Sequence, residues 1–211
     1  MAFQNVIFPD LKMKHGASKE IVMPVSVTGN GTRELRRKQN RFERFVWTIP
    51  ARTLLEADKQ AIYKFLNGVN YGLDSFLFRD PTMPELNGAI MTSRSGTTWF
   101  LNLPFDSTTA GTHPIMNPVM AGLTFKKNGV AVTGVTFGGL DSNGFPYITV
   151  PGSVVTDVIT VTGPVYMTAR FDSTFNFSIS AMAPSPLGAS CAPATTMIEL
   201  GDIKIVEVFE R

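Results

Sequence analysis

Histidine and cysteine, the residues that most often carry chemistry, are scarce in this sequence: it contains His15, His113 and a single cysteine, Cys191. These three residues cannot make a conventional Cys/His zinc site, and one cysteine cannot form an internal disulfide. No Gly-x-Gly-x-x-Gly follows a predicted strand, and no Gly-Lys-Ser or Gly-Lys-Thr closes a phosphate loop. We therefore expect no metal, no cofactor and no disulfide framework.

Acid–base catalysis would need a histidine beside a nucleophile, or a suitably spaced pair of carboxylates. His113 lies in Gly-Thr-His-Pro with no nucleophile elbow in the sequence, so we expect it to be an ordinary solvated loop histidine. The carboxylate pairs that could meet are Asp80 with Glu85, and Asp172 with Glu199. Because any β protein with 17 acidic residues offers such pairs, we expect the protein not to be an enzyme.

The most concentrated chemical feature is a basic segment from Arg33 to Arg44, with only Glu34 and Glu43 as acidic members. Its basic residues are Arg33, Arg36, Arg37, Lys38, Arg41 and Arg44. Alternation along a strand would divide them between two faces, which disfavours a phosphate-binding surface. Contact with a neighbouring subunit or a solvated face is favoured over contact with DNA, and the net charge of +2 is too small to indicate a nucleic-acid binder.

The elements that must position these residues are predicted to be mainly strands. Only 17% of the residues are charged, whereas Gly (18), Pro (14) and Phe (16) are plentiful, which is typical of short strands joined by turns. Residues 20–27 predict a strand, and Thr-Gly-Asn-Gly at 28–31 predicts a turn. Residues 41–49 predict a half-buried strand with Phe45, Trp47 and Ile49 directed at the core.

One helix is predicted, from Leu54 to Asn67. Thr53 and Glu56 fit a capping box at its start, and Gly68 stands where a left-handed C-terminal residue is expected. The apolar face should be formed by Leu55, Ile62, Phe65 and Leu66, and the solvent face by Glu56, Lys59 and Lys64. A single helix beside many strands predicts a mainly β fold.

Further strands and turns are predicted in the rest of the chain. Residues 74–80 form a strand that Pro81 stops, and a turn-rich stretch up to Ser95 is expected to close a first block. A second all-β unit, residues 96–182, should follow, with hairpin turns at Asn128-Gly129, Gly138-Gly139 and Asn143-Gly144. Residues 183–194 predict a proline-rich loop, and residues 197–209 a return to strand. No segment is apolar over the length of a bilayer, so no membrane anchor is expected.

The order of these elements resembles the distal tail proteins of long-tailed bacteriophages and gene transfer agents, best over residues 1 to about 93. The matching features are Phe8-Pro9, the Gly29-Asn30-Gly31 turn leading into Arg33-Glu34 and Arg36, the strand through Trp47, the lone helix, and the segment Phe76 to Asp80. Val165 to Asp172 looks like the end of the family's second domain, and Ile203 to Glu207 like its closing strand. Pro81 departs from the family pattern, and residues 94–162 match it only loosely.

The resemblance implies a fold and an architectural role. The fold would be a β-sandwich or barrel-like tail-hub domain with one flanking helix, residues 1–95 completed by 195–211, with a second β-sandwich-like domain inserted before the closing C-terminal strand. The role would be a hexameric ring at the virion tail tip, assembled in the host bacterial cytoplasm. Its partners would be the tail tube protein and the tail hub or tip proteins, with the tape measure protein a further candidate. DNA would pass through the ring transiently, without specific binding.

Two other functions compete with this interpretation. A carbohydrate- or receptor-binding β module would use exposed aromatic residues, for which Trp99, Phe145 and Tyr147 are the candidates. It would behave as a monomer or trimer that binds glycans, whereas a hub would form rings. An enzyme is the third candidate, and it would require an acid–base pair that the sequence does not display.

Overall fold

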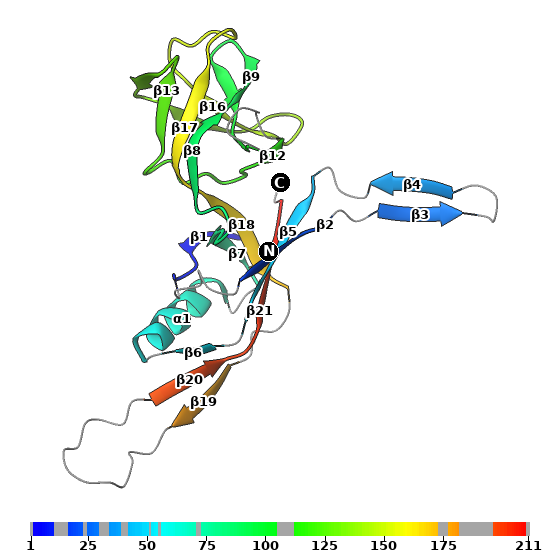
Figure 1. Cartoon of the computed structure of the whole chain (residues 1–211), viewed down its shortest axis with the longest axis vertical. Coiled ribbons are helices and arrows are strands. Elements are labelled where there is room, and N and C mark those ends of the chain that lie inside the picture. The colour runs from blue at the N-terminus through cyan, green and yellow to red at the C-terminus, as the bar shows by residue number, and fades with distance from the viewer. Residues whose placement is uncertain are drawn as a thin grey trace.

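The computed structural model describes residues 2–10, 17–22, 25–29, 34–38, 42–50, 52–54, 56–70, 73–104, 112–172, 177–181 and 196–209. Within these residues the protein is mainly β, with a single helix and several sheets in a β-sandwich-like arrangement, as predicted. A β module stands at one end, a six-stranded sheet with the helix beside it lies in the middle, and two hairpins extend away from that sheet (Figure 1).

The six-stranded sheet combines segments from the beginning, middle and end of the chain. Its strands, in spatial order, are β1 (Phe3–Ile7), β7 (Ser75–Arg79), β18 (Tyr166–Phe171), β21 (Ile203–Glu207), β5 (Arg44–Ile49) and β2 (Ser18–Val22). The β1–β7 pair is parallel, and the other pairs are antiparallel. The strand predicted at 74–80 is confirmed as β7, and the C-terminal strand lies inside the sheet as β21.

The sheet is strongly curled around an aromatic interior. Trp47 of β5 and Phe78 of β7 have ring centroids 4.9 Å apart, although β18 and β21 lie between their strands in the ladder. The predicted inward residues Phe45, Trp47 and Ile49 are confirmed as buried, with Trp47 and Ile49 fully inaccessible. On the other face Val46 is buried as well, whereas Arg44 and Thr48 are partly exposed, so the predicted alternation holds except at Val46.

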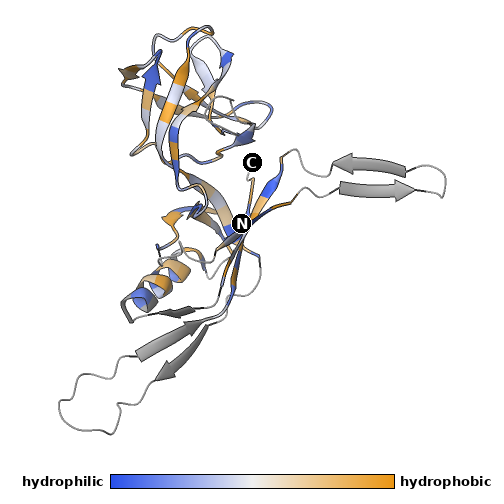
Figure 2. Ribbon diagram, in the orientation of Figure 1, coloured by the Kyte–Doolittle hydropathy of each residue, from blue (hydrophilic) through white to orange (hydrophobic). Residues whose placement is uncertain are grey.

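Helix α1 (Glu56–Gly68) covers the aromatic side of the sheet, and its ribbon alternates between hydrophobic and hydrophilic residues (Figure 2). Phe65 packs against Phe76 and Phe8, with ring centroids 5.0 and 5.1 Å apart. The predicted burial of Ile62, Phe65 and Leu66 and the exposure of Lys64 are confirmed. The side chains of Leu55, Glu56 and Lys59 lie outside the described residues.

Both predicted ends of the helix are wrong in detail. Thr53 and Leu54 belong to the short strand β6 (Arg52–Leu54), which pairs with a later strand, so no capping box begins the helix at Thr53. A tertiary strand pairing has overridden a local capping signal. At the other end Gly68 is still helical, and the left-handed residue is Asn70, with φ of 50°. Asn tolerates this conformation better than other non-glycine residues.

The β module contains two four-stranded sheets and one two-stranded sheet. The first sheet comprises β14 (Val130–Val132), β13 (Thr124–Lys127), β17 (Ile159–Pro164) and β8 (Glu85–Ile90). The second comprises β15 (Thr136–Leu140), β16 (Pro146–Thr149), β10 (Thr98–Phe100) and β9 (Thr92–Ser95). Strands β11 (Asn102–Leu103) and β12 (His113–Pro114) form the third. Buried side chains such as Trp99, Ile148 and Ile159 fill the module's interior.

A continuous two-stranded stem connects the module to the six-stranded sheet. β7 pairs with β18, from Phe76 opposite Ala169 to Arg79 opposite Tyr166. Farther from the six-stranded sheet β8 pairs with β17, from Glu85 opposite Pro164 to Ile90 opposite Thr160. The sheet boundaries therefore differ from the expected domain limits of 95 and 182. β8 and β9 belong to the module although residues up to 95 were expected to be a turn-rich close of the first block, and β18 belongs to the six-stranded sheet.

Two of the three predicted hairpin turns are confirmed. Asn128 and Gly129, with φ of 50° and 83°, join β13 to β14 in the doubly positive conformation that matches strand twist. Gly144, with φ of 78°, lies in the turn before β16. Gly138-Gly139 is not a turn: both residues lie within β15, at an irregularity in its pairing with β16. A Cβ on Gly138 would stand 2.2 Å from the Tyr147 ring, so glycine is needed there for close packing.

Two further sheets lie outside the six-stranded sheet and the module. β3 (Val25–Gly29) and β4 (Glu34–Lys38) form an antiparallel hairpin with no third strand in the described chain. β19 (Phe177–Ala181), β20 (Thr196–Leu200) and β6 form the other. The strand predicted at 20–27 is thus two strands, β2 and β3, and that predicted at 197–209 is β20 and β21. The 28–31 turn and the loop at 183–194 fall largely or wholly outside the described residues.

Trp47→Ala should lower the free energy of unfolding by about 3–5 kcal/mol, because it opens a cavity in the curled sheet. Trp47→Phe should cost much less, since it keeps a ring and removes an indole N–H that has no hydrogen-bond partner within the described residues. Leu73→Ala, at a side chain that is 66% exposed, is the control and should cost less than about 0.5 kcal/mol. Urea unfolding of the monomer measures all three, and a loss below about 1 kcal/mol for Trp47→Ala would contradict the core assignment.

Candidate functional site

The junction between the module and the six-stranded sheet contains a buried histidine–carboxylate pair. His113 Nε2 of β12 lies 2.8 Å from Glu207 Oε1 of β21, and the two side chains are 8% and 1% exposed. The expectation of a solvated loop histidine was therefore wrong. The local sequence gave no sign of it, because Glu207 is 94 residues away along the chain.

Glu207 is also held by the backbone and by its aromatic surroundings. Its Oε2 accepts a hydrogen bond from the Phe45 N–H at 3.0 Å, and the Phe45 ring stacks on His113 with centroids 4.1 Å apart. Burial raises the pKa of the Glu207 carboxyl, and the hydrogen bond and charge of His113 oppose that rise. The site therefore favours a protonated, neutral carboxyl more than water does.

This pair connects β12 of the module with β21 of the six-stranded sheet. The carboxylate orients the imidazole as in a catalytic triad, but among the described residues the hydrogen-bond partner of the ring is Glu207, and no nucleophile is bonded to it. Phe45 and Phe209 also contact the ring. A second aromatic contact joins the same two parts, since Phe42 packs against Phe145 with centroids 5.1 Å apart.

Three of the four carboxylates that could have formed catalytic pairs are bound to other groups. Asp80 forms an ion pair with Lys19 at 2.6 Å, and Glu85 pairs with Arg79 at 3.0 Å. Asp172 pairs with Lys204 at 3.2 Å, and the side chain of Glu199 lies outside the described residues. No group of three or more His, Cys, Asp or Glu side chains that could hold a metal occurs among the described residues. His15 and Cys191 fall outside them.

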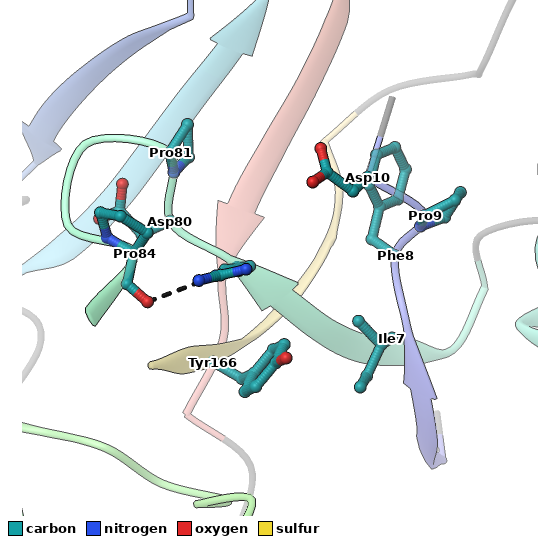
Figure 3. A pocket seen from close by; sticks show the side chains of 9 residues that line it. Ile7, Phe8, Pro9, Asp10, Asp80, Pro81, Pro84 and Tyr166 are labelled. Carbon is teal, nitrogen blue, oxygen red and sulfur yellow. Dashed lines mark hydrogen bonds between the residues drawn. The ribbon is translucent and has the colours of Figure 1, made fainter. Parts of the chain in front are cut away.

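A pocket of about 230 Å³ lies beside Asp80, between the end of β1 and the segment that follows β7 (Figure 3). Its lining residues are Ile7, Phe8, Pro9, Asp10, Arg79, Asp80, Pro81, Pro84 and Tyr166. The Arg79 Nε donates a hydrogen bond to the Pro84 carbonyl at 3.4 Å across one wall. Most of the lining side chains are apolar or proline, and the ionisable groups among them are Asp10, Arg79, Asp80 and Tyr166.

The basic segment is divided by the fold. Arg36, Arg37 and Lys38 are consecutive residues of β4, opposite Val27, Ser26 and Val25 of β3. Arg44 begins β5 in the six-stranded sheet, is half-buried, and has an Nε with no hydrogen-bond partner within the described residues. Arg33 and Arg41 lie outside those residues. The pairing of these arginines with carboxylates of a neighbouring subunit stays a prediction, and the lining of a channel is its alternative.

The three aromatic candidates for glycan binding are engaged in packing. Trp99 is 2% exposed, and its indole N–H donates to Ser153 Oγ at 2.9 Å. Phe145 packs against Phe42 and Phe100. The Tyr147 ring lies against Gly138 and 5.1 Å from the Arg94 guanidinium, which is itself paired with Asp141. Trp99 is therefore buried, whereas Phe145 and Tyr147 are half-buried.

No protein-family model matches the chain, and no curated protein matches its sequence. None of the described helical segments is long and apolar enough to cross a membrane.

Glu207→Gln should change how stability depends on pH. The pKa of the Glu207 carboxyl is raised in the folded state, so its contribution to stability is fully present below the ordinary value of 4.5 and is lost as pH rises through the folded-state pKa. Glutamine can accept the hydrogen bond from the Phe45 N–H and donate one to a neutral His113 ring, as the protonated acid does, without ionising. Urea unfolding across the acid and neutral range should therefore show the wild type losing stability, relative to Glu207→Gln, as pH rises. If the wild type instead gains stability relative to Glu207→Gln as pH rises, the partners of Glu207 stabilise its ionised form by more than burial destabilises it.

Proposed function

We propose that this chain is a structural subunit of a phage-type tail tip, a distal tail protein. It forms a ring that joins the tail tube to the tip proteins and surrounds the path of the ejected DNA. The proposal rests on the sequence resemblance over the first block of the chain and on features of the fold that suit subunit contact.

The β3–β4 hairpin is the observation that carries the proposal. It extends to one side of the six-stranded sheet, and within the described residues no third strand pairs with it (Figure 1). An isolated two-stranded hairpin is marginally stable in water. The hairpin also carries the most basic stretch of the chain. An arm of this kind is expected to lie on another molecule, and in a ring that molecule is the next subunit.

The ends of the six-stranded sheet offer a second contact. β1 and β2 are its terminal strands, and each carries an exposed isoleucine, Ile7 at 46% and Ile21 at 61%. A closed ring needs heterologous contacts, in which two different surfaces of the subunit meet at every interface. Terminal strands with exposed apolar side chains are suited to such pairing, and they would be an aggregation hazard if left uncovered.

Electrostatics favour pairing of the arm's cations over tight binding of DNA. Each phosphate contact made by an unpaired arginine would slow the transit of DNA, and a ring repeats each contact around its circumference. We therefore assign Arg36, Arg37 and Lys38 to carboxylates of the same or the adjacent subunit. Such pairs fix orientation and specificity more than they add stability.

Size-exclusion chromatography with light scattering and negative-stain imaging of the purified protein test the proposal. Rings of tube-like diameter are the expected result. A protein that remains monomeric or trimeric at high concentration and binds glycans would instead support the adhesion module.

Arg36→Glu with Arg37→Glu should leave the monomer folded, because within the described residues β4 pairs only with β3. The double change should weaken ring assembly, because like charges would repeat at each interface. The matched control is Lys64→Glu with Lys126→Glu, which makes the same change in net charge at exposed positions on α1 and β13. The ring-to-monomer ratio at fixed protein concentration is the measurement. If the arm variant forms rings as well as the control and only DNA ejection fails, the arm lines the channel.

A further inference from the structure

Lys19 and Asp80 form a short, sheltered contact between distant parts of the curled sheet. Lys19 Nζ on β2 lies 2.6 Å from Asp80 Oδ2, and the side chains are 15% and 2% exposed. Lys19 Nζ also stands 3.6 Å from the centroid of the Phe45 ring and 6.0 Å from that of Trp47. The small exposed fractions show that both side chains are largely shielded from bulk solvent. Keeping two full charges in such a place is costly, so a reaction that removes both charges is favoured relative to the same reaction in water.

The second oxygen of Asp80 is held by two donors from one residue. Asp80 Oδ1 accepts hydrogen bonds from the Thr82 N–H at 2.8 Å and from the Thr82 hydroxyl at 2.7 Å. The carboxyl group therefore has one oxygen directed at an amine and the other in a cradle of fixed donors. Donors placed in this way stabilise the negative oxygen that develops when a nucleophile adds to a carbonyl carbon.

We propose that Lys19 and Asp80 are joined by an intramolecular isopeptide bond. A proton first passes from the Lys19 ammonium to Asp80 Oδ2, and the freed Nζ lone pair attacks Asp80 Cγ. The negative charge moves to Oδ1, where Thr82 donates two hydrogen bonds. Oδ2 then receives a second proton from Nζ, the Cγ–Oδ2 bond breaks, and one water leaves as the Nζ–Cγ amide forms. No atom is oxidised or reduced, and no other reactant is needed.

Proximity lowers the barrier that the same reaction between two separate molecules would face. The fold holds the amine and the carboxyl in contact, and well-oriented intramolecular partners reach effective concentrations on the order of 10⁵ M or more. The pocket of about 230 Å³ beside Asp80 provides a place for the released water. The bond would join β2, at one end of the strand order, to the residue that directly follows β7, near the other end. This inference is independent of the tail-tip proposal.

The chain provides its own comparison pair. Lys204 and Asp172 also form an ion pair, but at 3.2 Å and with side chains 50% and 40% exposed. Solvent stabilises both charges there. No cross-link is expected at that pair, although the residue types are the same.

Intact mass spectrometry of the denatured full-length protein is the primary test. The expected mass is lower than the sequence mass by one water, and a tryptic digest should contain a branched peptide that links the Lys19 segment to the segment beginning at Asp80. Lys19→Arg and Asp80→Ala should both restore the full sequence mass of the variant. Thr82→Val removes the hydroxyl donor but keeps the backbone N–H, so a smaller fraction of that variant should be cross-linked after the same incubation.

The wild-type result alone decides the matter if a variant fails to fold. A wild-type protein at its full sequence mass would overturn the proposal and leave the contact an ion pair. Loss of water that maps to a cyclised aspartate or to Lys204 and Asp172 would overturn it equally. Water loss carried by the branched Lys19–Asp80 peptide and absent from Lys19→Arg would establish the bond.

Discussion

The curl of the six-stranded sheet is the constraint on which the rest of the structure depends. Only a curled sheet brings Trp47 of β5 against Phe78 of β7 across two intervening strands. The same curvature lets α1 cover the aromatic side through Phe65, and it brings Lys19 to Asp80. A flat sheet of these strands would leave its largest side chains without partners, and large aromatic side chains contribute most of the apolar area that a core can bury.

The two most deeply buried of the described carboxyl groups each have partners at both oxygens. Glu207 is fully enclosed, yet both of its oxygens are bonded, to His113 and to the Phe45 N–H. Asp80 is equally enclosed and is bonded to Lys19 and Thr82. The contacts of Glu207 with His113 on β12, and of Asp80 with Lys19 on β2, tie together segments that are not neighbours in a sheet. Removing one partner would leave a buried group unsatisfied, which costs more than the hydrogen bond itself contributes.

Local signals in the sequence were sufficient for some parts of the fold and misleading for others. The alternation around Trp47 and the apolar positions Ile62, Phe65 and Leu66 predicted buried faces correctly, because periodicity reports burial directly. Asn128-Gly129 predicted its hairpin because that dipeptide tolerates the required dihedral angles. Gly138-Gly139 looked the same but serves close packing under Tyr147, which no local pattern reveals.

The polar sites could not be predicted, because each depends on pairing over long separations. His113 meets Glu207 across 94 residues, and Lys19 meets Asp80 across 61. The capping signal at Thr53 failed for the same reason, since β6 pairs with β20 far along the chain. The pattern of a single sequence predicts which residues are buried, but it does not predict which distant residue will pair with a buried charged group.

The place of β21 between β18 and β5 also sets an order of events during synthesis. Residues 85–164 contain every strand of the module's own sheets, so the module can form while later residues are still inside the ribosome. β5, by contrast, is made early and must wait for residues 203–207 before its ladder to β18 can close. Until then the strand that carries Trp47 lacks a neighbour on one side, and such long-range pairing is slow and exposed to aggregation. The nascent chain therefore has most need of chaperone protection over its first-made strands.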